Sequence, residues 1–354
     1  MKNVKLLMVF FSVALSILLI NGCSKNSTTP IVPPTPAPGP GTILHNVVYG
    51  KNINVDGQME TLDMDIYFPP NMQAGKKYPL VMHMHGGGYS IGTKDNSAAK
   101  MLLLADSGFI STTINYRLGW DNGPGVCAGD MESLYEAAYR AIQDANAAMR
   151  FLVSKADEYQ IDTNWIFESG ASAGGSIALT STYMTDAYAI SYNSAVAAKL
   201  GGLNNQGNSL TNTFTVKGIC SIGGSLQDST LINSNLAIPT IFFQGGADQT
   251  IPVDIGTYLM CPNYIELFGS LCLYRQLRAN GKPAVAHILP GADHGNNGDS
   301  GFSSDFMMSN TACFFHTLMK KGPQQVGIYM DGTTARLKIK SPAHLIVPGF
   351  VKYI

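Results

Sequence analysis

The chain has 354 residues, of which 45% are hydrophobic and 9% aromatic, so it has enough apolar material for a large core, and complete disorder is excluded. Charged residues make up only 13% of the chain, with 23 basic side chains against 24 acidic ones. Because no excess of positive charge is present to hold a phosphate backbone, the composition argues against a nucleic-acid partner.

The N-terminus has the pattern of an export signal. Lys2 and Lys5 precede a mainly apolar run of about 15 residues (6–20), which is too short to span a membrane comfortably and suits the core of a signal peptide. Cys23 follows shortly after, behind a small residue, and this junction resembles the signal of bacterial lipoproteins. The resemblance implies a signal peptide over 1–22, a lipid on Cys23 and a protein anchored to a membrane of the bacterial cell envelope. A secreted soluble protein and an uncleaved anchor are the alternatives.

Residues 23–42 form a linker in which Pro, Ser and Thr dominate and no apolar periodicity exists. Such a composition predicts an extended, semi-rigid tether. The folded domain is therefore expected to span 43–321. Residues 322–354 are left as a C-terminal extension with two strand-like runs, to which the sequence assigns no role.

From residue 43 onward, strand and helix patterns alternate. Two segments, 46–56 and 60–69, alternate apolar and polar residues as half-buried antiparallel strands do. Short apolar strands then alternate with helices, which predicts an α/β fold whose mostly parallel central sheet has helices on both faces. The predicted later strands are 79–85, 108–116, 164–169, 215–222, 238–244 and 284–290, and the predicted helices are 97–107, 131–155, 172–184, 264–280 and 303–321.

Two polar insertions, 185–214 and 249–265, interrupt this alternation and show no clear period. Long irregular segments inside a compact domain commonly carry function. We therefore expect these insertions to form a lid or the rim of a pocket.

The cysteines predict a disulfide in the second half of the chain. If Cys23 carries lipid, five cysteines remain, which allows at most two disulfides. Cys261 and Cys272 are close in sequence and flank a loop, so they are the predicted pair, whereas Cys220 lies in an apolar run and is predicted to be a buried free thiol. No CxxC pair and no Cys/His zinc spacing is present, so neither a metal nor another cofactor is expected.

The segment Gly170–Gly174 matches the G-x-S-x-G pattern of a serine nucleophile. It lies between the predicted strand 164–169 and a helix rich in small residues. A sharp turn from strand to helix strains the backbone and exposes the serine hydroxyl, so Ser172 is the predicted nucleophile. A tight glycine-rich turn with a capping serine is the alternative. A second match surrounds Ser90, but it lacks such a helix behind it.

A glycine run, 86–88, follows the predicted strand 79–85. Glycines let the backbone point several N–H groups at one place. Together with the N–H of Ala173, they can bind the oxyanion that forms when a carbonyl is attacked. A plain turn is the alternative, and His85 is expected to fix this loop through hydrogen bonds.

A serine hydroxyl becomes a good nucleophile when a base takes its proton. His294 follows the last predicted strand in a glycine-containing loop and is the predicted base, whereas His287 lies within that strand and is expected in the core. Asp248 follows the preceding strand and is the predicted acid that orients the base. The resulting chain order of Ser, Asp and His is the one expected of such a fold. Asp254 and Asp228 are the alternatives.

Five motifs together resemble an α/β-hydrolase-fold carboxylesterase and occur in that family's order over about 45–320. The motifs are HGGGY (85–89), INYRLG (114–119), ESGASAGG (168–175), GGADQTIP (245–252) and GADHG (291–295). INYRLG and ESGASAGG are similar to type-B carboxylesterases, whereas the short length and the Asp-containing loop are similar to bacterial feruloyl or acetyl esterases. The resemblance implies that Gly87 and Gly88 donate their N–H groups to the oxyanion.

The same resemblance implies a serine carboxylesterase that works through an acyl-enzyme. The expected partner is a small-molecule or polysaccharide-linked ester, with short acyl chains favoured. A serine peptidase similar to prolyl-oligopeptidase catalytic domains is one alternative, and a non-catalytic binding lipoprotein is another. Covalent labelling of the serine separates an active hydrolase from a binding protein, and turnover of esters against amides separates esterase from peptidase.

Overall fold

The computed structural model describes residues 38–295, 298–321 and 324–330. The predicted signal peptide, Cys23 and most of the linker lie outside the described residues, so export and lipidation stay predictions. The second strand-like run of the C-terminal extension, 335–340, also lies outside them. Among the described residues, no helix combines the length and the apolar character that crossing a membrane requires.

The core of the fold is a nine-stranded sheet in the order β1-β2-β4-β3-β5-β6-β7-β10-β11. The first two strands, β1 (Ile43–Ile53) and β2 (Met59–Tyr67), pair antiparallel, and β2 is also antiparallel to β4 (Ile110–Ile114). All other neighbours are parallel, which confirms the predicted fold class. The remaining strands are β3 (Tyr78–Met84), β5 (Ile161–Ala171), β6 (Val216–Ile222), β7 (Thr240–Gly245), β10 (Ala284–Leu289) and β11 (Gly327–Tyr329).

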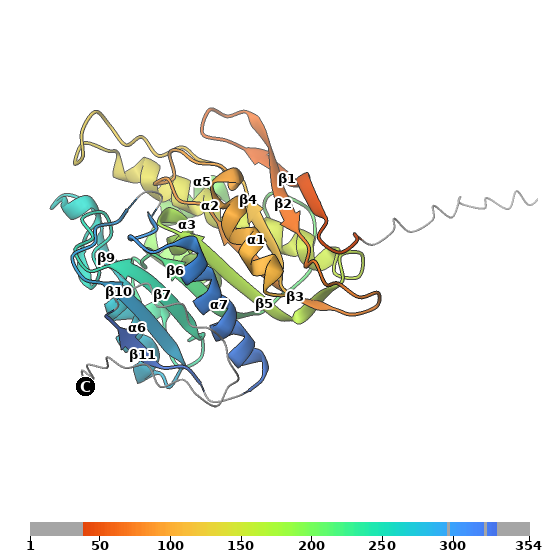
Figure 1. Ribbon diagram of the computed structural model, residues 1–354. Helices are drawn as coiled ribbons and strands as arrows, with labels where there is room; N and C mark the ends of the chain where they lie inside the picture. Colours follow the sequence, from red (N-terminus) through yellow and green to blue (C-terminus); the bar gives the residue numbers. More distant parts are fainter. Residues whose placement is uncertain (1–37, 296–297, 322–323, 331–354) are drawn as a thin grey trace, which may run out of the picture. The chain divides into compact units, whose positions relative to one another are not determined.

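Helices cover both faces of this sheet, as Figure 1 shows. One face packs against α1 (Ala98–Asp106) and α7 (Ser304–Met319), and the other against α2 (Met131–Ser154), α3 (Ala173–Tyr183) and α6 (Ser270–Ala279). A strand covered on both faces is apolar at nearly every position. In β3, Leu80 and Met82 therefore join the core on the α2 side, while Val81 joins the core on the α1 side.

The two insertions form compact structure beside the sheet. The first contains two short helices, α4 (Asp186–Tyr192) and α5 (Ser194–Leu200), whose N-termini are capped by Thr185 and Asn193. The second contains a small antiparallel sheet of β8 (Ile255–Thr257) and β9 (Glu266–Phe268), joined by the single 3₁₀ turn Tyr258–Met260. The predicted helix 264–280 was therefore wrong at its start, because β9 occupies part of it and α6 begins only at Ser270. The other 3₁₀ turns are Lys94–Ser97 and Ser229–Leu231.

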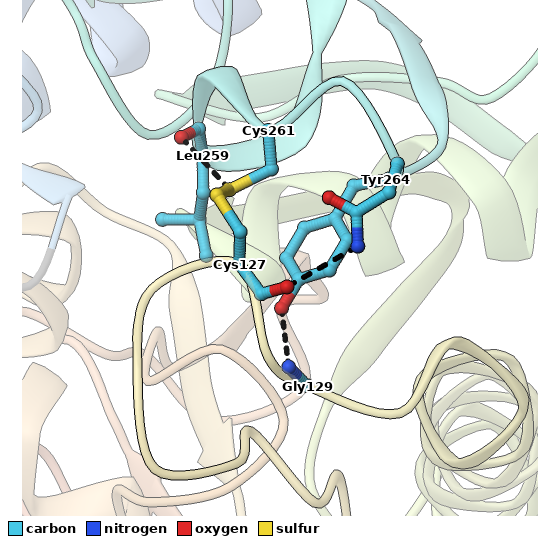
Figure 2. Close-up of a disulfide and its surroundings, with 6 residues drawn as sticks. Cys127, Gly129, Leu259, Cys261 and Tyr264 are labelled. Carbon is cyan, nitrogen blue, oxygen red and sulfur yellow. Dashed lines mark hydrogen bonds between the residues drawn. A yellow bond between two sulfur atoms is a disulfide. The ribbon is translucent and has the colours of Figure 1, made fainter.

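The predicted disulfide between Cys261 and Cys272 was wrong. Cys261 pairs with Cys127 across 134 residues of sequence, with Cα atoms 5.5 Å apart (Figure 2). Cys272 is a half-buried free thiol on α6. The reason is tertiary, since the loop after β4 packs against the second insertion, and closeness in sequence did not decide the pair. Cys220 is a fully buried free thiol, as predicted.

The parallel strands bring four loops to one edge of the sheet. The glycine run follows β3, Ser172 follows β5, Asp248 follows β7 and His294 follows β10. Because the carboxyl ends of parallel strands lie at the same edge, ligands of such folds bind there. The topology therefore collects every residue that the sequence predicted for chemistry at one edge.

Candidate active site

Ser172 lies on the sharp turn between β5 and α3. Its backbone has φ 54° and ψ −123°, a conformation that a residue other than glycine rarely adopts. A Cβ on Gly170 would lie 2.1 Å from the Gly174 carbonyl oxygen, and a Cβ on Gly174 would lie 2.1 Å from the Met84 carbonyl oxygen. The G-x-S-x-G spacing thus reflects two close backbone approaches that any side chain would block.

Three side chains from separate loops meet at this turn. The Ser172 hydroxyl oxygen lies 2.8 Å from Nε2 of His294, and Nδ1 of His294 lies 2.8 Å from Oδ2 of Asp248. All three residues are buried. With its proton on Nδ1, the imidazole donates to the carboxylate and accepts from the serine hydroxyl. This arrangement is suited to removing the serine proton when a carbonyl is attacked.

Asp248 is held in place by its own loop. Its Oδ1 accepts hydrogen bonds from the backbone N–H groups of Thr250 and Ile251, each at 2.9 Å. The side-chain amide of Gln244 donates to Oδ2 at 3.3 Å. Because these donors fix the carboxylate, Oδ2 stays directed at the imidazole of His294.

The alternative carboxylates are engaged elsewhere. Asp254 forms an ion pair with Arg275, and Asp228 accepts a hydrogen bond from the Tyr188 hydroxyl at 3.0 Å. Asp293, the sequence neighbour of the histidine, accepts from two backbone N–H groups, and these hydrogen bonds lower its carboxyl pKa. The structure therefore brings only Asp248, among these carboxylates, to the imidazole.

Gly87 and Gly88 form a turn next to Ser172. Their φ values are 117° and 59°, and a Cβ on Gly87 would lie 1.9 Å from the Ile91 carbonyl oxygen. Neither glycine N–H has a hydrogen-bond acceptor in the described part of the chain. Ala173 is the first residue of α3, so its N–H has no acceptor inside the helix. Three backbone donors are thus available around the serine.

The glycine turn is supported from behind by His85 and the INYRLG segment. The imidazole of His85 donates from Nδ1 to the Gly86 carbonyl at 2.7 Å, as predicted for a residue that fixes the loop. Burial lowers its pKa, so the ring is neutral. Tyr116 stacks on this ring at 4.3 Å and donates its hydroxyl to the His85 carbonyl at 2.8 Å.

Arg117 explains why INYRLG is part of the resemblance. Its guanidinium is fully buried and forms a bidentate pair with Asp144 of α2, with Nη2 2.7 Å from Oδ1 and Nε 2.9 Å from Oδ2. Such a pair fixes geometry as well as charge. The sequence reasoning did not identify this anchor. The signal was present, because Arg117 directly follows the predicted buried strand 108–116, and a buried arginine calls for a buried partner.

Ser90 and His287 lie apart from the trio of Ser172, His294 and Asp248. Ser90 lies in the turn after the glycines and donates to the Gly87 carbonyl at 3.2 Å. His287 is stacked between Phe243 and Tyr329 at 5.0 Å from each ring, which confirms its place in the core. No group of three or more His, Cys, Asp or Glu side chains within the described ranges is placed to hold a metal ion.

Glu168 lies on β5 below Ser172 and is almost completely buried. Burial raises its carboxyl pKa to about 7, and hydrogen bonds from the Ser181 and Thr182 hydroxyls only partly offset this rise. The strand that carries the serine therefore holds a carboxyl group that resists ionisation.

A cavity of about 110 Å³ lies against Ser172 and Ala173. An apolar cavity of about 150 Å³ holds one benzene molecule, so a short acyl chain fits this space. Both insertions contribute to its wall, which confirms that they form the rim of a pocket. Its apolar and aromatic lining includes Tyr89, Leu134, Ala138, Ile142, Ile177, Met184, Ala189, Val196, Ile251, Tyr258 and Leu267.

Comparisons with known proteins agree with this architecture. Residues 64–227 match the model of the family described as BD-FAE. A truncated carbohydrate esterase from gut microbiota superposes with a TM-score of 0.53 at 18% identity, over 81% of this chain and 100% of that chain. The predicted resemblance to α/β-hydrolase-fold esterases is therefore confirmed.

Curated relatives match over shorter stretches. Esterase E4 of Myzus persicae is 28% identical over 144 residues, and the non-reducing polyketide synthase adrD of Penicillium rubens is 30% identical over 179 residues. These matches cover 39% and 48% of this chain, but only 24% and 6% of the relatives' own lengths. The similarity is therefore to one part of each relative.

Proposed function

The chain has the α/β-hydrolase fold, and on this premise we propose that it is a serine carboxylesterase. The observation that carries the proposal is the pair of 2.8 Å contacts that join Ser172, His294 and Asp248 at the carboxyl edge of the sheet. The BD-FAE match and the esterases among its relatives support the same reaction class.

In the proposed mechanism, Ser172 attacks an ester carbonyl while His294 takes the hydroxyl proton. Asp248 orients the imidazole and stabilises the imidazolium. The N–H groups of Gly87, Gly88 and Ala173 hold the oxyanion. The imidazolium then protonates the leaving alcohol. In the second half of the reaction, His294 takes a proton from a water molecule that attacks the acyl-enzyme, and it returns this proton to the Ser172 oxygen as the acid leaves.

The cavity supports an assignment of the two sides of the ester. It is lined by Ser172 and Ala173, but His294 is not among its lining residues. Because His294 must reach the leaving oxygen to protonate it, the alcohol lies on the histidine side. We therefore propose that the acyl group occupies the apolar cavity and that its volume selects short chains.

A carbohydrate-linked alcohol fits this orientation, because the cavity does not have to accommodate it. The name of the structurally similar carbohydrate esterase supports such a substrate. The N-terminal sequence supports a location at the cell envelope, with the enzyme tethered through lipid on Cys23.

The test is hydrolysis of p-nitrophenyl esters with two to sixteen acyl carbons, with acetylated xylan, methyl ferulate and a p-nitroanilide alongside. We expect activity to be highest on short chains and absent on the anilide. Ser172→Ala should lower kcat by roughly 10⁴-fold or more and abolish labelling by a fluorophosphonate. A wild-type protein that is labelled but cleaves only the anilide would identify a peptidase, and one that is neither labelled nor active would identify a binding protein.

A further inference from the structure

Tyr258 places an unpaired hydroxyl in the cavity beside the glycine turn. Its side chain lines the same cavity as Ser172 and is only 8% exposed. The hydroxyl oxygen lies 3.4 Å from the position that a Cβ on Gly88 would occupy. Within the described residues, no hydrogen-bond partner contacts this hydroxyl. The hydroxyl oxygen is not one of the fully buried unpaired atoms of the described residues, so it is open to the cavity and can donate to a bound ligand.

The hydroxyls of the other cavity tyrosines have partners, and those of Tyr135 and Tyr192 form a hydrogen bond with each other. The hydroxyl of Tyr89 donates to the Ala173 carbonyl at 3.4 Å, and that of Tyr139 donates to the Gly201 carbonyl at 2.8 Å. Their hydroxyl groups are therefore explained by the fold itself. Tyr258 differs because its hydroxyl lies beside Gly88 of the glycine turn and has no hydrogen-bond partner among the described residues.

The position of Tyr258 is fixed from several sides. Its ring packs against Trp120 at 5.5 Å and against Tyr264 at 6.1 Å. Two following residues, Leu259 and Met260, adopt left-handed conformations with φ of 54° and 55°. Non-glycine residues rarely occupy this region, and they persist there where the surroundings impose it.

A disulfide clamps the end of this strained turn. Cys261 is bonded to Cys127, and the Tyr264 hydroxyl accepts a hydrogen bond from the Gly129 N–H at 2.5 Å, as Figure 2 shows. Both contacts join the turn to the loop after β4. The Cys127–Cys261 disulfide and the Gly129–Tyr264 hydrogen bond, together called the clamp, therefore hold Tyr258 on the cavity wall.

The same turn is connected to the acid of the trio. The Leu259 N–H donates to the Thr250 carbonyl at 2.8 Å, and the Thr250 N–H donates to Oδ1 of Asp248 at 2.9 Å. Tyr258 is thus tied to the loop that orients His294. This connection fixes the hydroxyl relative to the reacting atoms.

We propose that Tyr258 is a further catalytic residue, whose hydroxyl donates a hydrogen bond to the carbonyl oxygen of the ester as negative charge develops on it. This role rests on the proposed function and adds a side-chain donor to the backbone donors Gly87, Gly88 and Ala173. Burial raises the pKa of the Tyr258 phenol, so the hydroxyl keeps its proton and remains a donor.

The experiment compares wild type, Tyr258→Phe and Tyr264→Phe on p-nitrophenyl acetate and butyrate. Removal of one oxyanion donor lowers kcat by about 10²–10³-fold in other enzymes, and with several donors present we expect a loss of roughly 10–100-fold in Tyr258→Phe. KM should stay within about threefold, because a contact made mainly in the transition state changes kcat. Phosphonylation of Ser172 by a fluorophosphonate should slow by a similar factor.

Tyr264→Phe is the matched control, because it removes a phenol of the same aromatic cluster that lies outside the cavity. The variant also removes one polar contact to Gly129, but the disulfide and the Leu259 backbone hydrogen bond still hold the turn, so its kcat should stay within about threefold of wild type. An equal loss in both variants would overturn the proposal, since the effect would then come from the clamp. Unchanged kcat in Tyr258→Phe, or a rise in KM alone, would overturn it as well. A wild-type protein that hydrolyses neither ester would overturn the proposed function and, with it, this role.

Discussion

The trio and the pocket rim are built in different ways. Ser172, Asp248 and His294 each follow a strand of one parallel sheet, so hydrogen-bonded ladders through the whole core fix their separation. The rim segments 121–130 and 255–268 lie outside that sheet and are joined by the Cys127–Cys261 disulfide and by aromatic packing.

The contacts that hold the two regions differ in how much of the fold they involve. Residues that must meet within hydrogen-bonding distance rest on the most cooperative part of the fold. The wall that contacts the substrate rests on a few local contacts, one of them covalent. Substitutions in the rim should therefore change the pocket while the three catalytic side chains stay together. Substitutions in the trio should leave the fold intact.

The largest expected effect is on the trio. Asp248→Asn keeps the size of the side chain but no longer stabilises the imidazolium or its tautomer, so kcat should fall by roughly 10³–10⁴-fold. The melting temperature should change little. Asp254→Asn, which removes a half-exposed carboxylate paired with Arg275, should stay within about twofold in kcat. If Asp248→Asn kept more than a tenth of wild-type kcat, the acid would have to be sought elsewhere.

A smaller effect is expected at the rim. Cys127→Ser opens a covalent loop of 134 residues and should lower the free energy of unfolding by about 2–5 kcal/mol. KM for short esters should rise and kcat should fall, because the disulfide also holds Tyr258, whereas fluorophosphonate labelling of Ser172 should persist at a lower rate. Denaturant titration without reductant measures the stability change.

Cys272→Ser provides the control for the disulfide, because it removes a half-buried free thiol. Its free energy of unfolding should change by less than about 1 kcal/mol. A loss as large as that in Cys127→Ser would contradict the pairing and restore Cys272 as a partner of Cys261.

The smallest expected effect concerns the strand beneath the trio. In the fold, Glu168 has a pKa of about 7, above its usual value of 4.5, so the native state binds this proton more tightly than the unfolded state. Its contribution to stability is therefore complete below about pH 4.5 and is lost as the pH rises through 7. Glu168→Gln should remove up to about 3 kcal/mol of this dependence and raise the melting temperature at pH 8 relative to wild type. Melting temperatures are measured against pH for wild type, Glu168→Gln and the exposed control Glu132→Gln. If all three changed with pH in parallel, the raised pKa of Glu168 would not contribute to stability as described.

Much of the site could be predicted from short stretches of sequence. The elbow at Ser172 could be recognised locally, because Gly170 is required by a backbone approach to Gly174 within five residues, whereas Gly174 is required by an approach to Met84 of the adjoining β3. Asp248 and His294 follow recognisable strands, and strand order places their loops at one edge. The alternation of strands and helices likewise fixed the two-faced core, because burial on both faces leaves a continuous apolar run in each strand.

The remainder was not visible in local patterns. The start of α6 was misplaced, because β9 pairs with β8 and a three-residue strand has no periodicity to detect. The α4 and α5 helices are each seven residues long, too short for a helical period to stand out. Arg117 could be seen, but its partner Asp144 could be named only from the packing of α2 against the loop after β4.

The α/β class, the elbow serine, the glycine turn and the residues that follow β7 and β10 could be recognised in the sequence, because each leaves a pattern within a short stretch of the chain. The Cys127–Cys261 pair, the cavity that both insertions line and the position of the Tyr258 hydroxyl beside Gly88 became visible only in the folded protein. Those features join segments more than a hundred residues apart, and their contacts follow from how whole elements pack and not from any local pattern.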